Sequence, residues 1–126
     1  MTRSLNPETR KRLLSLRRLE RSRAIEALNR VLAEQDRLIA ELELVRVAMA
    51  EHHEKLNAPA MKERCPSVPY LSAVMHNRMC LSKRLEHHEK REQHLIRALA
   101  TSRETVSQAQ AHAAKAQLAL NALEQS

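Results

Sequence analysis

Residues 71–123 of the chain read LSAVMHNRMCLSKRLEHHEKREQHLIRALATSRETVSQAQAHAAKAQLALNAL. Alternating steps of three and four residues along this stretch meet sixteen positions, of which twelve are apolar. A 3.5-residue repeat sustained over about seven heptads is typical of a helix packed along a partner helix. The stretch contains no Gly or Pro, the two residues that interrupt helices most strongly. The positions of this seam are Leu71, Val74, Arg78, Leu81, Leu85, His88, Glu92, Leu95, Leu99, Ser102, Val106, Ala109, Ala113, Ala116, Leu120 and Leu123.

The first half of the chain carries a matching pattern. Asn6 and Pro7 suit a helix start, because Asn caps free backbone N–H groups and Pro fits the first helical position. Pro59 favours a helix end just before it. Nine of thirteen positions in this second seam are apolar. They are Leu14, Arg17, Arg21, Ala24, Leu28, Val31, Gln35, Leu38, Leu42, Val45, Met49, His52 and Leu56.

The two patterns predict an all-α fold, an antiparallel two-helix coiled-coil hairpin that forms one elongated domain. We expect a helix over about 7–56, a connecting loop over 57–66 and a helix over about 67–124. Helices of this size measure roughly 75–90 Å at 1.5 Å per residue. The short loop cannot return the chain over that distance, so the helices must run antiparallel or not pack within one chain.

Folding back about the loop predicts a register in which facing residue numbers add to 127. This register places Leu42 near Leu85 and Leu56 near Leu71, and it puts Gln35 beside Glu92. It also places Leu28 near Leu99, and Arg17 and Arg21 beside the Ala-rich stretch from Ala109 to Ala116, where small residues leave room for long stems.

Composition and charge narrow the functional classes. The 126 residues include no Gly, and Tyr70 is the only aromatic residue, so a conventional globular core is not expected. The net charge is +7, and residues 1–30 hold nine Lys/Arg against three acids, which predicts an acidic partner surface. Cys65 and Cys80 lack metal or redox spacing and are expected to be reduced thiols. No apolar run is long enough for a membrane span.

The motif Glu-His-His-Glu-Lys occurs twice, at residues 51–55 and 86–90. Paired histidines and carboxylates suit zinc. The predicted register, however, places His52 opposite about residue 74 and His88 opposite about residue 38. That separation is about 20 Å along the axis, so we expect no metal site and interpret both histidines as polar seam residues.

Nothing in the sequence indicates catalysis. The chain has no Gly-rich phosphate loop, no recognisable nucleophile motif and little concavity expected of two helices, so no enzyme and no cofactor are predicted. The basic run that includes Arg10, Arg12 and Arg17 leaves nucleic-acid binding as an alternative, although acids interrupt it. A coiled-coil scaffold that dimerises is a second alternative, since a hairpin and a swapped dimer bury the same seams.

Residues 13–28 read LLSLRRLERSRAIEAL. This Leu/Arg-rich opening helix, within an aromatic-poor hairpin, resembles the type III secretion stalk proteins, namely the YscO/SctO proteins and their flagellar counterpart FliJ. The resemblance implies a non-enzymatic protein of the bacterial cytoplasm, peripheral at the inner-membrane secretion apparatus. It implies binding to a hexameric secretion ATPase and to an export-gate protein, with secretion chaperones as further partners. The seams themselves leave the oligomeric state open between a monomer and a homodimer.

On that resemblance, the basic opening helix is the expected contact with the ATPase. The predicted partner-binding residues are Arg10, Arg12, Leu13, Leu16, Arg17, Arg18, Leu19, Arg21 and Arg23.

Overall fold

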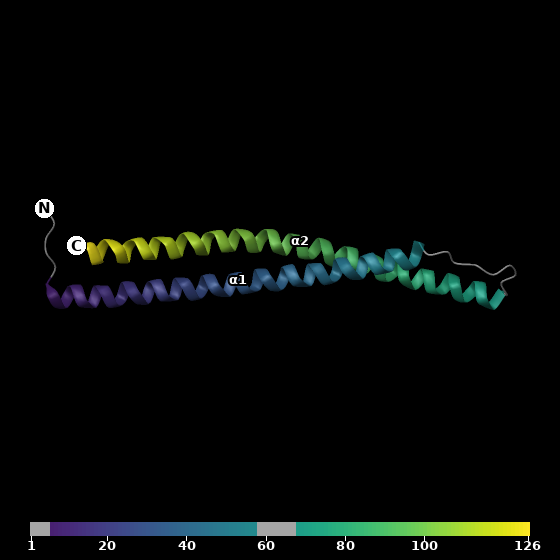
Figure 1. Ribbon diagram of the computed structural model, residues 1–126, viewed down its shortest axis with the longest axis horizontal. Helices are drawn as coiled ribbons and strands as arrows, with labels where there is room; N and C mark the ends of the chain where they lie inside the picture. The colour runs from purple at the N-terminus through teal and green to yellow at the C-terminus, as the bar shows by residue number, and fades with distance from the viewer. Residues whose placement is uncertain (1–5, 58–67) are drawn as a thin grey trace. The chain divides into compact units, whose positions relative to one another are not determined.

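The structure is a computed structural model that describes residues 6–57 and 68–126. It contains two long helices, α1 (Pro7–Asn57) and α2 (Val68–Gln125), and no strand within the described ranges (Figure 1). Apart from Asn57, the predicted connecting loop lies outside the described residues, as does Cys65.

The start of α1 follows from its first residues. Asn6 Oδ1 accepts a hydrogen bond from the backbone N–H of Glu8 at 3.0 Å, and the Asn6 carbonyl accepts one from the N–H of Arg10 at 2.8 Å. Pro7 takes the first helical position, where the absence of an N–H costs nothing. The predicted capping by Asn6 is confirmed.

The two helices form an antiparallel hairpin, which confirms the predicted all-α fold class. Burial follows the predicted seams: among all of their positions only Arg21 and Arg78 are exposed. No polar or charged residue is buried in the described ranges. The buried hydrophobic residues there are Ala24, Leu38, Leu42, Leu95, Leu99, Val106 and Leu120.

The packing falls into two units, each made of a piece of α1 and a piece of α2. The first unit joins the chain up to Arg37 with the chain from Ala100 onward, and the second is Leu38–Leu99. In the second unit Leu95, only 1% exposed, lies in a core cluster with Leu38, Leu42 and Leu99. Burial of these side chains from water is the main force holding this part of the hairpin together.

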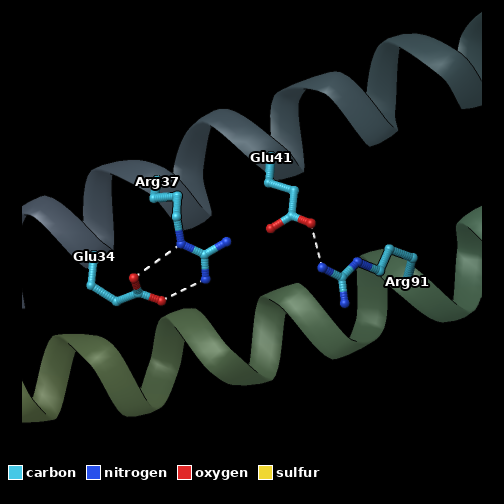
Figure 2. A network of polar contacts seen from close by, with 4 residues as sticks. All are labelled: Glu34, Arg37, Glu41 and Arg91. Carbon is cyan, nitrogen blue, oxygen red and sulfur yellow. Dashed lines mark hydrogen bonds and ion pairs between the residues drawn. The ribbon is translucent and has the colours of Figure 1, made fainter.

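Ion pairs flank the core of the second unit. Arg91 of α2 pairs with Glu41 of α1, as Figure 2 shows, and Arg46 Nε donates to Glu92 Oε2 at 3.1 Å. These pairs are partly exposed, so each contributes on the order of 1 kcal/mol or less. These ion pairs help to fix the register of α1 against α2, because in another register their charged side chains would face an apolar layer and be poorly solvated.

The register differs from the prediction, because contacts between α1 and α2 are displaced by 5–13 residues from the positions at which facing numbers add to 127. Glu41 meets Arg91 instead of residue 86, Arg46 meets Glu92 instead of residue 81, and the Leu56 carbonyl accepts from Arg78 at 3.3 Å instead of facing residue 71. These three contacts are displaced by 5–11 residues, and the contact between His52 and His88 is displaced by 13.

The specific pairings predicted from that register are wrong with it. Leu42 packs in the cluster of Leu95 and Leu99 and not against Leu85, and Glu92 receives Arg46 where Gln35 was expected. The physical reason is the repeat itself. Moving one seam by seven residues puts apolar positions on apolar positions again, so burial discriminates poorly between the two registers.

None of the helices in the described ranges combines the length and apolar character that crossing a membrane requires.

Candidate interaction surface

The predicted partner-binding residues divide into those that the hairpin uses and those that it leaves exposed. Arg10 belongs to the hairpin. Its Nη2 donates to the carbonyls of Leu123 and Glu124, each at 3.4 Å, and it is half-buried against the last turns of α2. A cation at a helix C-terminus is favourable because the final carbonyls carry partial negative charge. Arg10 Nε is buried and has no hydrogen-bond partner among the described residues.

Arg17 is also held within the hairpin. It is half-buried, and its Nη1 donates to Glu20 Oε2 at 3.0 Å, one helical turn further along α1. Arg17 and Arg23 line a hollow of about 450 Å³ whose opposite wall includes Ala116 and Ala119 of α2. Ala116, at the end of the Ala-rich stretch predicted beside Arg17, is part of this lining, together with the larger His112 and Lys115.

Two further arginines lie outside the seam. Arg21, which was predicted to lie beside the Ala-rich stretch of α2, is exposed. Arg18 is exposed, and its Nη2 lies 4.0 Å from Glu124 Oε1, the outer limit of an ion pair. Both guanidinium groups therefore remain well hydrated and accessible to a partner.

Leu16 and Leu19 lie on the side of α1 that α2 does not cover, with side chains 48% and 46% exposed. Arg12 and Arg23 are exposed one turn to either side of them, and the Arg23 side chain also lines the hollow shared with α2. The four residues follow one another at intervals of four, three and four, so they share one helix face. We call this set, Arg12, Leu16, Leu19 and Arg23, the outer stripe.

The outer stripe combines apolar and cationic character. Leu13 is half-buried and belongs to the side of α1 nearer the seam. Between residues 10 and 23 there are seven Lys/Arg and one acid, Glu20. An apolar pair framed by arginines is a composition enriched at protein interfaces, where it would meet an apolar patch with an acidic rim.

The two Glu-His-His-Glu-Lys motifs come together, contrary to the prediction. His52 and His88 stack across the helices with ring centroids 5.1 Å apart, and His87 lies 6.0 Å from His88. The expected separation of about 20 Å failed because it depended on the register that the structure overturns. His52 Nδ1 is buried without a hydrogen-bond partner in the described part of the chain.

A pair of stacked rings is not a chelating arrangement, because the ring faces and not the nitrogens meet. Within residues 6–57 and 68–126, no three or more His, Cys, Asp or Glu side chains converge on a point where a metal ion could bind.

One carboxyl group on the surface of α1, that of Glu34, has a shifted pKa. Glu34 receives two hydrogen bonds from Arg37, from Nε at 3.0 Å and from Nη2 at 2.6 Å, as Figure 2 shows. The hydrogen bond and charge of Arg37 lower the pKa of Glu34 below its ordinary value, and this outweighs the opposing effect of desolvation. Glu34 and Arg37 lie one helical turn apart, and this bidentate ion pair does not form a binding site by itself.

Comparison with known proteins found no family model, no curated protein and no solved structure that matches the chain.

Sequence reasoning missed one surface. Val68, Met75 and Met79 expose 78%, 69% and 55% of their surface at the beginning of α2. These residues lie beside the predicted seam and not on it. The available signal was charge: residues 68–77 contain no Asp, Glu, Lys or Arg, in a chain that is 29% charged.

Proposed function

We propose that the chain is a non-enzymatic stalk or adaptor protein of a bacterial type III secretion export apparatus. In this role the outer stripe binds the hexameric secretion ATPase and promotes its activity, and the protein links the ATPase to the export gate at the inner membrane. The proposal rests on the resemblance of residues 13–28 to the YscO/SctO and FliJ opening helix. The single structural observation that supports it is the outer stripe, whose four residues are all exposed.

The chemistry of the outer stripe defines the partner surface. Leu16 and Leu19 would lose water only by entering an apolar patch, and Arg12 and Arg23 would pair with carboxylates around it. Opposite charges at such an interface also speed association, because they steer the two surfaces together. A stalk needs no cavity of its own, since its contribution is a shaped and charged surface that the ATPase recognises.

The structure sharpens the choice of test residues. Arg10 bonds to carbonyls at the end of α2 and Arg17 is a half-buried seam residue, so changing them would confound binding with folding. The double variant Arg12→Glu with Arg23→Glu reverses charge only at exposed positions. We expect this variant to reduce stimulation of the secretion ATPase from the same organism about tenfold at subsaturating concentration.

The matched control is Arg84→Glu with Arg103→Glu, which makes the same charge change at exposed positions of α2. Circular dichroism should show both variants as helical as the parent chain. If the outer-stripe variant stimulates the ATPase as well as the control does, the assignment of the outer stripe is wrong.

The concentration of basic residues in 10–23 also favours the alternative, nucleic-acid binding, since phosphate attracts the same arginines. The apolar residues separate the two functions. Leu16→Ser with Leu19→Ser should weaken ATPase binding about tenfold, because it removes the apolar anchors. It should leave any binding to duplex DNA unchanged, because phosphate contacts use the arginines alone.

A further inference from the structure

The beginning of α2 extends past the last residue of α1 that the structure describes. Near the described end of α1 the Leu56 carbonyl accepts a hydrogen bond from Arg78, and α2 starts ten residues earlier, at Val68. Figure 1 shows this part of α2 continuing beyond the end of α1. The observed register is the cause, because it pairs Leu56 with Arg78 and leaves residues 68–77 beyond the described end of α1.

The exposed turns carry a continuous apolar surface. Leu71 and Val74 belong to the α2 seam and are half-buried, whereas Met75 and Met79 are largely exposed next to them. A hollow of about 630 Å³ runs along this face, lined among the described residues by Val68, Leu71, Ser72, Met75, His76 and Met79. We call these six residues the tip face. It continues the interface that α2 makes with α1 onto turns of α2 that lie beyond the described end of α1.

The distribution of charge along the chain indicates what kind of partner binds the tip face. At a net charge of +7, two copies repel one another over most of their surface. Residues 68–77 carry no Asp, Glu, Lys or Arg, and the one charge between Met75 and Met79, on Arg78, is bonded to the Leu56 carbonyl, so two tip faces can meet with few opposing like charges. An acidic or basic partner would find no countercharge within this stretch. The composition therefore favours a second copy over a charged partner.

We propose that the tip face is the interface of a homodimer, in which α2 of one chain packs antiparallel against α2 of a second copy. A two-fold axis at Met75 would place the two Met75 side chains together and Leu71 of one copy opposite Met79 of the other. The seam residue Leu71 then obtains the helical partner that α1 provides elsewhere. Methionine suits such a contact, since its unbranched side chain adapts to fill the interface. This inference does not depend on the ATPase role.

The test is the mass of the full chain in solution, measured by sedimentation equilibrium over about 10 µM to 1 mM. We expect the mass to rise from 14.5 kDa toward twice that value as concentration increases. Met75→Lys with Met79→Lys should raise the dissociation constant at least about tenfold, because it places four cations in the contact. The matched control is Leu44→Lys, an equally exposed apolar residue on α1 of the same unit.

A second measurement tests the geometry. In a chain with Cys65→Ser and Cys80→Ser, the variant Met75→Cys should form an intermolecular disulfide on mild oxidation, since the axis brings the two residues within bonding distance. Leu44→Cys should not. A chain that stays at 14.5 kDa throughout overturns the proposal, as does a dimer that Leu44→Lys abolishes and the Met variant leaves intact.

Discussion

Replacement of Leu95 by Ala should lower the free energy of unfolding by about 3 kcal/mol. Leu95 is the least exposed side chain of the core cluster, at 1% of its surface, and it packs with Leu38, Leu42 and Leu99. The substitution removes three buried carbon atoms, each worth about 0.8 kcal/mol of transfer free energy. The cavity adds a smaller amount, because a core between only two helices can partly close around it.

The assay is urea unfolding followed by circular dichroism at 222 nm, a wavelength set by helical backbone. The control is Leu44→Ala, since Leu44 is 72% exposed and its truncation should change the free energy by no more than about 0.5 kcal/mol. A loss below about 1 kcal/mol for Leu95→Ala, or equal losses for both variants, would show that Leu95 is not a core residue.

The same substitution tests the register. Leu42 and Leu95 share the core cluster, so their double-mutant cycle should give a coupling of about 0.5–1 kcal/mol. Leu42 and Leu85, which the sequence-based register had paired, should be additive within about 0.5 kcal/mol. The reverse result would restore the register in which residue numbers add to 127.

Three further outcomes follow from local contacts. His52→Leu with His88→Leu should raise the free energy of unfolding by about 1–3 kcal/mol. The double variant removes a buried nitrogen that has no described partner and makes that layer of the seam apolar. A melting temperature below that of the parent chain would contradict this prediction. Asn6→Ala should cost about 1 kcal/mol by removing the helix cap, whereas Asn6→Ser should retain most of it. Arg37→Ala should raise the pKa of Glu34 toward its ordinary value in an NMR titration. Because that pKa is lowered in the folded chain, the stabilisation it reports is present at neutral pH and is lost as pH falls through the folded value.

Much of this fold could be predicted from the sequence, because it depends on interactions between residues close together in the chain. Asn6 and Pro7 begin α1 as expected, because capping and the fixed φ of proline act within a few residues. The seams were predictable because 3.5-residue spacing directs side chains to one face whatever the partner is. The exposure of Leu16 and Leu19 followed from the same spacing, since both fall outside it.

The exceptions on the seams show where spacing alone was insufficient. Arg21 and Arg78 occupy seam positions and yet are exposed, because a long side chain can extend its charge to water from the edge of the interface. Arg10 had been assigned to a partner, but it bonds to the carbonyls at the end of α2. Such a contact joins residues more than a hundred positions apart and leaves no trace in local sequence.

The sequence by itself determined that two long helices form, which face of each is apolar, and that the first is strongly basic. Only the tertiary structure decided the register, because a heptad repeat fits its partner equally well after a shift of seven residues. The polar contacts chose between the alternatives: Glu41 with Arg91, Arg46 with Glu92, and the stacked His52 and His88. That choice brings the histidines together and extends the beginning of α2 past the described end of α1.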